Sequence, residues 1–244
     1  FDALNHSMST LSTGGFSTKN ASVSYWNDTP LIQYIIILFM YLAGTNFVLS
    51  YFAFKGKVNK IINDEEFILY SKFIIVFTLI VAGIIYYNSY LDNVLVFDHP
   101  LVFGAVEGSI RHALFQVVAI ITTTGFVTAD YTLWSPFLLV FFFGLMFLGG
   151  SAGSTSGGVK VVRHLVLIKN GFLEFKRSLH PSAILPVRYN NKSVSGEIVF
   201  NVLGFFILYM LSFIVGSLGF AFLGLDFESS IGVAASSLGN VGPA

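Results

Sequence analysis

The sequence contains no cysteine, which excludes disulfide bonds, thiolate catalysis and zinc or iron–sulfur sites built on cysteine. Charged side chains are scarce at 11% of the residues, less than half of the share of about 25% that is usual in soluble domains. Hydrophobic residues, by contrast, make up 55%. This composition excludes a disordered chain and predicts an integral membrane protein. The formal net charge of zero provides no field that attracts nucleic acid, so no nucleic-acid partner is expected.

Four apolar segments are long enough to cross a membrane as helices, which takes about 20 residues. A buried core helix is the alternative for any one of them, but four such segments between polar loops favour spans. Because the chain starts at Phe1 and not at a methionine, we expect it to be a piece of a longer protein. The four segments are residues 31–54, 67–90, 132–159 and 198–225, and the only charge within them is Lys72.

Lysine and arginine are unevenly distributed among the loops. They gather after the first and third spans, whereas the other side holds only Lys19 and Arg111 and most of the acidic residues. Basic loops stay on the cytoplasmic side, so the chain is expected to begin and end on the outer side. The larger basic group is either a set of anchors beside anionic lipid or a docking surface for a cytoplasmic regulator. It includes Lys160, Arg163, Lys169, Lys176 and Arg177.

Three segments on the outer side, residues 2–17, 109–128 and 227–244, are half apolar but too short to span a membrane. Segments of this kind are re-entrant or buried in protein. Their loops resemble one another, so the sequence predicts repeated units of span, short helix, glycine loop and span. The matching loops are Ser-Thr-Gly-Gly-Phe-Ser-Thr (12–18), Thr-Thr-Thr-Gly-Phe-Val-Thr (122–128, an offset of 110 residues) and Gly-Asn-Val-Gly-Pro (239–243).

Three glycine loops that follow half-helices on one face predict a cation pathway. Stacked backbone carbonyls replace the hydration shell of potassium, and glycine permits the backbone angles that aim successive carbonyls inward. The carboxyl ends of short helices add partial negative charge. No acidic residue stands at any of the three glycine turns, which disfavours a calcium-type filter made of carboxylate rings. An ordinary turn is the alternative for one copy, but the motif recurs.

Residues 149–158 interrupt the third span with five glycines in ten residues. Each glycine destabilises a helix interior by about 1 kcal/mol relative to alanine, so a continuous helix is not expected here. The break must then be packed in protein or line a wet cavity. A phosphate-binding loop is excluded because Val159 separates the last glycine from Lys160. A nucleophile elbow would need a strand-to-helix context, so no enzymatic activity is expected.

Together these motifs resemble the filter loops of the Trk/Ktr/HKT superfamily of potassium transporters. The runs Gly-Gly-Ser-Ala-Gly-Ser-Thr-Ser-Gly-Gly-Val-Lys-Val-Val-Arg (149–163) and Lys-Arg-Ser-Leu-His-Pro (176–181) are similar to its TrkH-like membrane subunits. The resemblance implies an all-α membrane protein with four covalently linked units of span, pore helix, filter loop and span around one potassium-channel-like pore, incomplete here. Residues 1–54 would end the second unit, 55–168 form a complete third unit with a broken inner span, 169–195 a cytoplasmic linker, and 196–244 the start of the fourth unit.

The resemblance also assigns roles to individual residues. The arginine that faces the gate loop in the family belongs to a last span that this chain does not contain. The filter that binds potassium is expected at Thr13, Gly14, Gly15, Thr123, Thr124, Gly125, Asn240, Val241 and Gly242. A gate loop beneath the filter is expected at Gly149, Gly150, Ser151, Ala152, Gly153, Ser154, Thr155, Ser156, Gly157 and Gly158.

The function implied by the resemblance is potassium uptake across a bacterial inner membrane. Potassium in the pore would be the only metal ion, with no covalently bound cofactor. The implied partners are a second copy of the protein, a cytoplasmic TrkA-like nucleotide-binding ring and the lipid bilayer. A sodium-permeable relative stays open because the first filter loop is not in the chain, and so does a non-conducting membrane scaffold. Filter glycines do not distinguish a channel from a cation-coupled symporter.

Overall fold

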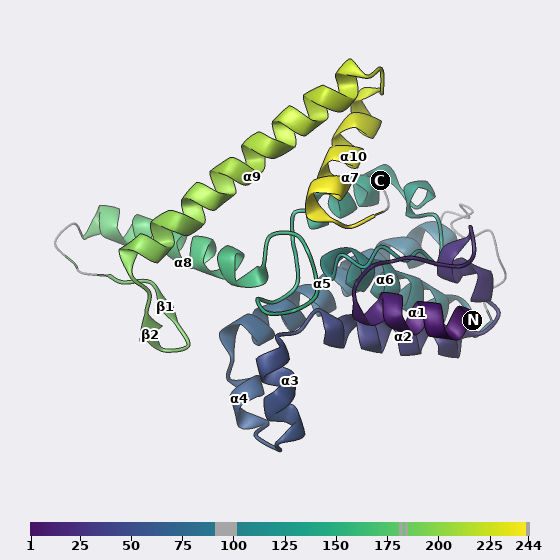
Figure 1. Cartoon of the computed structure of the whole chain (residues 1–244), viewed down its shortest axis with the longest axis horizontal. Coiled ribbons are helices and arrows are strands. Elements are labelled where there is room, and N and C mark those ends of the chain that lie inside the picture. Colours follow the sequence, from purple (N-terminus) through teal and green to yellow (C-terminus); the bar gives the residue numbers. More distant parts are fainter. Residues whose placement is uncertain (91–101, 181–182, 184, 243–244) are drawn as a thin grey trace.

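The computed structural model describes residues 1–90, 102–180, 183 and 185–242. Within them the regular structure is helical apart from one short hairpin (Figure 1). Pro181, Pro243 and Ala244 of the predicted motifs lie outside the described residues. The helices are α1 (Asp2–Leu11), α2 (Pro30–Ala43), α3 (Phe47–Phe54), α4 (Asn59–Ile62), α5 (Glu65–Tyr90), α6 (Ala105–Ile121), α7 (Pro136–Leu145), α8 (Val161–Leu179), α9 (Gly196–Phe222) and α10 (Phe227–Gly239), with short turns η1 (Ser22–Trp26) and η2 (Tyr131–Leu133). Strands β1 (Arg188–Tyr189) and β2 (Lys192–Ser193) form the antiparallel hairpin.

Two helices in the described part of the chain, α5 and α9, are long and apolar enough to cross a membrane, and the bent pair of α2 and α3 makes a third candidate. The expected spans at 67–90 and 198–225 are therefore confirmed as continuous helices, although α9 ends at Phe222. Along α9 only Val199 and Tyr209 are buried. Figure 1 shows α9 running away from the body, with α10 folding back beside its end. An apolar helix that exposes most of its faces is typical of a membrane protein.

The expected span at 31–54 is not one continuous helix, because α2 ends at Ala43 and α3 leaves at an angle of 108°. The break has two physical causes. Asn46 caps α3, since its side-chain oxygen accepts a 2.8 Å hydrogen bond from the amide of Val48. Gly44 lies so close to α5 and α6 that a Cβ there would be 2.4 Å from the Tyr70 hydroxyl. In Figure 1, α3 and α4 consequently project from the rest of the molecule.

The interruption expected in the third apolar segment is confirmed. Helix α7 ends at Leu145, and the chain continues without regular helix until α8 begins at Val161. The non-helical stretch is thus longer than the glycine-rich residues 149–158 alone. Helix α8 then runs to Leu179, so the boundary expected between residues 168 and 169 falls inside a helix.

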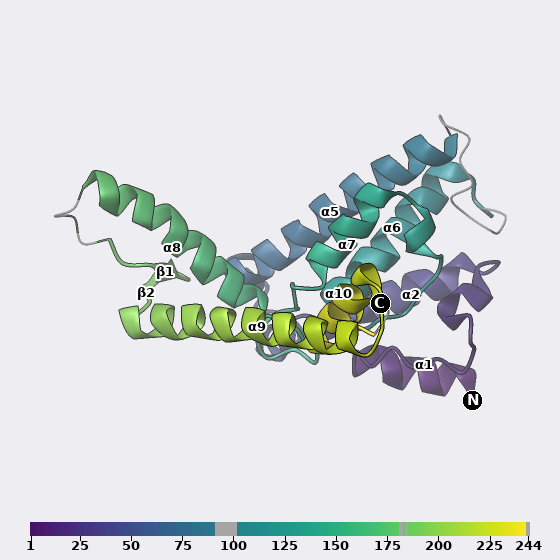
Figure 2. The ribbon, with the colours of Figure 1, turned by 90° about the horizontal axis from the view of Figure 1, so that it is seen from above.

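The core of the molecule is centred on α6. Its residues from Phe115 to Ile121 include Val117, Val118 and Ile120, all with no exposed surface. Helices α5, α2 and α7 pack around α6, and Figure 2 shows them gathered on one side of the molecule. Because α6 is enclosed, the loop that follows it is held in a fixed place relative to three other helices.

Candidate ion pathway

The three predicted filter loops share one backbone geometry. Each begins with a non-glycine residue in the left-handed region, and each has a glycine at positive φ two residues later. The left-handed residues are Thr13 (φ 51°), Thr123 (φ 53°) and Asn240 (φ 57°). The glycines are Gly15 (φ 70°), Gly125 (φ 76°) and Gly242 (φ 112°). The repeat that the sequence suggested from letters alone is therefore a repeat of conformation.

The hydrogen bonds that close the helix ends repeat in the same way. In each loop the amide that follows the left-handed residue donates back to a carbonyl in the last turn of the helix, which is the bond that ends a Schellman motif. The three bonds are Gly14 N to Ser9 O (2.8 Å), Thr124 N to Ala119 O (2.8 Å) and Val241 N to Ser236 O (2.9 Å). Helices α1, α6 and α10 thus present their carboxyl ends to the three loops in one manner.

Threonine is an unusual residue for the left-handed region, because its branched Cβ crowds the backbone. A strained residue of this kind costs about 1–3 kcal/mol and persists only where the surroundings hold it. Thr13 and Thr123 are both buried, with 3% and 1% of their surface exposed. Residues held in this way are concentrated at functional sites, which supports a specific role for the two loops.

The loop around Gly125 is approached by the backbones of both other loops. A Cβ on Gly15 would lie 1.9 Å from the carbonyl oxygen of Thr124. A Cβ on Gly242 would lie 3.8 Å from the Cα of Gly125. All three glycines therefore belong to one site, and position 15 has no room for a side chain.

A second repeated contact ties the far end of two of the predicted filter loops to the helix that precedes each of them. Thr18 donates a 3.0 Å hydrogen bond to Asp2 of α1, and Thr128 contacts His112 of α6 at 2.8 Å. Both members of the second pair lie 110 residues after those of the first. The hydrogen bond from Thr18 and the neighbouring Lys19 ammonium lower the pKa of Asp2. The sequence reasoning missed this contact, although the 110-residue offset aligns all four residues.

A buried charge lies behind the second of these segments. Arg111 of α6 has no exposed surface, and its Nε donates a 2.7 Å hydrogen bond to Glu107. Its guanidinium also donates to Gln33 of α2. Gln33 in turn donates to Asn27 at 2.5 Å, and Asn27 donates to the backbone carbonyl of Thr128 at 3.0 Å. A continuous polar chain therefore connects the arginine to the end of the filter segment.

The predicted gate loop is closed at its base by its own backbone. The amide of Gly149 donates to the carbonyl of Val159 at 2.8 Å, and the amide of Val161 donates to the carbonyl of Gly150 at 3.1 Å. We refer to residues 149–152 and 159–162, the two limbs that these bonds join, as the neck of the loop. A Cβ on Gly149 would lie 2.4 Å from the carbonyl oxygen of Gly157, so the neck requires glycine at that position.

The second half of the same loop contacts one predicted filter residue and the carboxyl ends of the other two helices, α1 and α10. Gly157 donates a 2.6 Å hydrogen bond from its amide to the Thr123 hydroxyl, and a Cβ on Gly157 would be 2.8 Å from the Gly239 carbonyl. The Thr155 hydroxyl donates to the carbonyl of Leu11, the last residue of α1, at 3.1 Å. The structure thus brings the predicted gate residues and the predicted filter residues together.

The break between α2 and α3 is a further part of this site that the sequence reasoning missed. Ser151 donates its amide to the Gly44 carbonyl at 2.9 Å, and the amide of Phe47 donates to the Gly153 carbonyl at 3.1 Å. A local signal was present, since Gly-Thr-Asn (44–46) is a polar interruption in an apolar run. The broken helix supplies free backbone groups at the depth where the loop needs partners.

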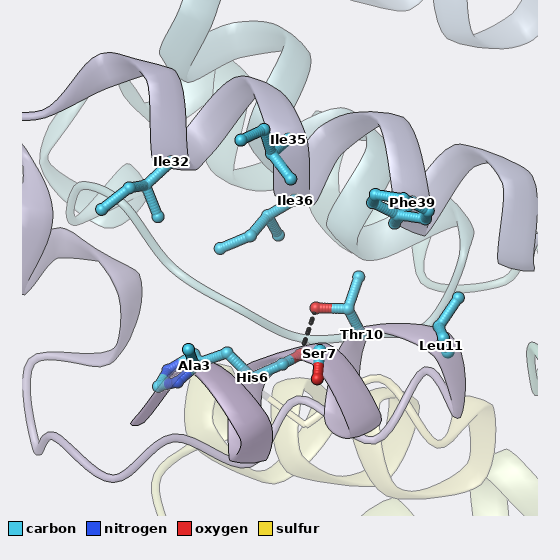
Figure 3. A pocket seen from close by; sticks show the side chains of 9 residues that line it. All are labelled: Ala3, His6, Ser7, Thr10, Leu11, Ile32, Ile35, Ile36 and Phe39. Atoms are coloured by element: carbon cyan, nitrogen blue, oxygen red, sulfur yellow. Dashed lines mark hydrogen bonds between the residues drawn. The ribbon is translucent and has the colours of Figure 1, made fainter. Parts of the chain in front are cut away.

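A separate cavity of about 270 Å³ lies between α1 and α2, and Figure 3 shows Ile35, Ile36 and Phe39 facing Thr10 across it. Its lining is almost wholly apolar. The His6 ring is hydrogen-bonded to the Asp2 carbonyl at 2.8 Å and to the Ser17 hydroxyl at 2.9 Å. Both ring nitrogens are therefore used to hold the loop after α1 against that helix. Across the described residues, no group of three or more His, Asp and Glu side chains is placed to hold a metal ion.

Comparisons with known proteins agree with this geometry. A family model described as "TrkH: Cation transport protein" matches residues 1–244. The Trk system potassium uptake protein TrkH of Salmonella typhimurium is 36% identical over 244 residues, which cover 100% of this chain and 48% of that protein. TrkG of Escherichia coli K12 is 34% identical and covers 99% of this chain and 47% of that protein. The chain spans about half the length of the curated relatives it matches.

A solved structure shows the same fold. The crystal structure of the potassium transporter TrkH from Vibrio parahaemolyticus superimposes with a TM-score of 0.87 at 34% identity, covering 99% of this chain and 50% of that one. The predicted class, an all-α multi-pass membrane protein of the transporter type and not an enzyme, is thereby confirmed.

Proposed function

Because the chain belongs to the TrkH family of cation transport proteins, we propose that it forms part of the pathway for potassium uptake. The observation that carries the proposal is the shared backbone of three helix-end loops that one glycine-rich loop contacts. The relatives of similar sequence are named potassium uptake proteins.

The proposed filter consists of the nine residues of the three loops. Its proposed ligands for potassium are backbone carbonyl oxygens, since no carboxylate occurs among the nine. The carboxyl ends of α1, α6 and α10 add partial negative charge toward the ion. Potassium is the cargo of this site, and we propose no covalently bound cofactor.

The proposed gate is the loop 149–158. Its second half is hydrogen-bonded to the Thr123 hydroxyl and to the Leu11 carbonyl, which supports a position against the inner side of the filter. Potassium would pass when this loop moves aside. The sequence division into units at 1–54, 55–168, 169–195 and 196–244 also stays a proposal, with α8 crossing one of its boundaries.

The proposed setting is a bacterial inner membrane, with the basic loops in the cytoplasm and the filter loops outside. The Lys and Arg residues of α8 support this orientation, because basic segments stay on the cytoplasmic side. A second copy of the protein and a cytoplasmic TrkA-like nucleotide-binding ring are the proposed partners, and control of the gate would belong to that ring.

Uptake of rubidium and potassium into proteoliposomes that hold the complete parent protein tests this proposal. We expect potassium-selective flux over sodium, and we expect Gly125→Ser to lose that selectivity because Gly125 has φ 76° inside the filter. Gly83→Ser is the matched control, since a Cβ on Gly83 of α5 meets nothing within 4 Å. If Gly125→Ser leaves the potassium selectivity unchanged, the filter lies elsewhere. If the unmodified protein shows no flux even with its regulator supplied, a non-conducting scaffold is supported.

A further inference from the structure

A single buried carboxylate contacts the neck of the proposed gate loop from outside the loop. Glu66, in the first turn of α5, has only 2% of its surface exposed. Its Oε1 accepts one hydrogen bond from the amide of Ala152 at 2.7 Å and another from the amide of Val162 at 3.2 Å. These two amides lie ten residues apart and on opposite sides of the neck. One oxygen atom thus joins the two limbs of the loop.

The same carboxylate supplies a cap that α8 lacks. The residue at the N-cap position of α8 is Lys160, which makes no side-chain capping bond. Helix N-termini favour an acceptor side chain and a negative charge, and lysine offers neither. Glu66 provides both to the first turn of α8 by way of Val162, although it belongs to a different helix. Burying a carboxylate costs free energy unless it is hydrogen-bonded. Breaking these bonds therefore leaves both the Glu66 carboxylate and the two backbone amides unsatisfied, which is unfavourable.

The position of Glu66 is fixed by the helix that carries it. Helix α5 is continuous from Glu65 to Tyr90, and it packs along the buried helix α6. The neighbouring Glu65 contacts other residues: its Oε2 lies 2.6 Å from Lys169, farther along α8, and accepts from the amide of Asn190 at 3.1 Å. Two adjacent acidic residues therefore have separate partners: Glu66 binds Ala152 and the first turn of α8, and Glu65 binds the middle of α8 and the hairpin turn.

We propose that Glu66 is a positioning residue that holds the gate loop against the filter in the closed state. The inference rests on the proposed function of the loop as a gate. For the loop to leave the pathway, the amides of Ala152 and Val162 must separate from one oxygen or swing about it. Loss of the carboxylate therefore favours the open loop, while the hydrogen bonds that close the three filter loops stay intact.

Uptake by the complete protein without its cytoplasmic regulator is the first test. We expect Glu66→Gln to raise this basal uptake about tenfold, which corresponds to weakening a charge-assisted hydrogen bond by about 1.4 kcal/mol. Glu66→Asp keeps the charge but withdraws it by one methylene, and it should raise basal uptake as well. The preference for potassium over sodium should be unchanged in both variants. Glu65→Gln is the matched control and should stay within twofold of the unmodified protein.

Two outcomes would overturn the inference while potassium uptake itself stands. One is basal uptake in both Glu66 variants equal to that of the unmodified protein. The other is an equal rise in Glu65→Gln, which would indicate general loosening of α5. Absence of flux in the unmodified protein, with and without regulator, would instead refute the proposed function.

A measurement on the unmodified protein keeps the inference testable if the variants do not fold. Amide hydrogen exchange should show Ala152 and Val162 protected together in the closed state, and losing protection together when the regulator activates uptake. Continued protection of both amides in the active state would show that Glu66 does not release the loop.

Discussion

The amide of Gly157 donates a 2.6 Å hydrogen bond to the side-chain oxygen of Thr123, the strained residue at the end of α6. This bond joins the glycine-rich loop between α7 and α8 to the loop that follows the most deeply buried helix. A displacement of one loop therefore strains or breaks this bond, so the side chain of Thr123 connects the proposed filter to the proposed gate.

Replacing this side chain separates the hydrogen bond from the shape of the residue. Thr123→Val keeps the branched Cβ but leaves the Gly157 amide without its acceptor, which costs about 1–3 kcal/mol. We expect basal uptake to rise at least fivefold, measured as rubidium entry into proteoliposomes without regulator. Thr123→Ser retains the oxygen and should stay close to the unmodified protein. Equal behaviour of the valine and serine variants would contradict a role for the hydroxyl.

Glycine at position 15 is required for space and not only for its backbone angle. Gly15→Ala would place a Cβ 1.9 Å from the Thr124 carbonyl oxygen at φ 70°. Gly56→Ala is the matched control, since Gly56 has φ 69° but a Cβ there meets nothing within 4 Å. Positive φ alone costs alanine about 1 kcal/mol. We expect Gly56→Ala to transport normally and Gly15→Ala to lose uptake and melt at a lower temperature. Normal uptake by both variants would mean that the two filter loops separate in solution.

The polar chain behind the predicted filter predicts coupling between the buried Arg111 and the half-buried Glu107. Arg111→Met leaves Glu107 without its cation and Gln33 without its donor. Breaking a fully buried pair costs about 3–5 kcal/mol, which is the upper limit here because the Glu107 side chain is 22% exposed. Glu107→Gln in the same chain removes the uncompensated charge and should recover part of the lost thermal stability. Melting temperatures of the two single variants and the double variant measure the coupling. Additive losses would show that the two side chains act independently.

The sequence predicted those parts of the fold that depend on local composition. Long apolar runs identified α5 and α9, and five glycines in ten residues located the break before α8. The bend after Ala43 escaped prediction although Gly-Thr-Asn (44–46) interrupts the apolar run, because the close approach of Gly44 to Tyr70 joins residues far apart in the chain.

The candidate site divides in the same way. The repeated residues around Gly15 and Gly125 and the glycine turn at 239–243 predicted three matching loops, and the left-handed conformation of Thr13, Thr123 and Asn240 shows that their backbones match. No local sequence pattern predicted the contact between Glu66 and the loop neck, because an acidic residue in the first turn of a helix is common and usually faces solvent. Hydrogen-bond partners that are brought together only by tertiary packing cannot be predicted from the spacing of nearby residues.

The shared left-handed position of the three loops holds threonine twice and asparagine once. Each copy is encoded at a separate place in one chain, so a substitution alters one side of the ion's surroundings and leaves the others as they were. In a ring of identical subunits the same substitution would be imposed on every side at once. A single-chain design therefore permits uneven surroundings at the proposed filter, in which one side can be altered in small steps while the other loops stay unchanged.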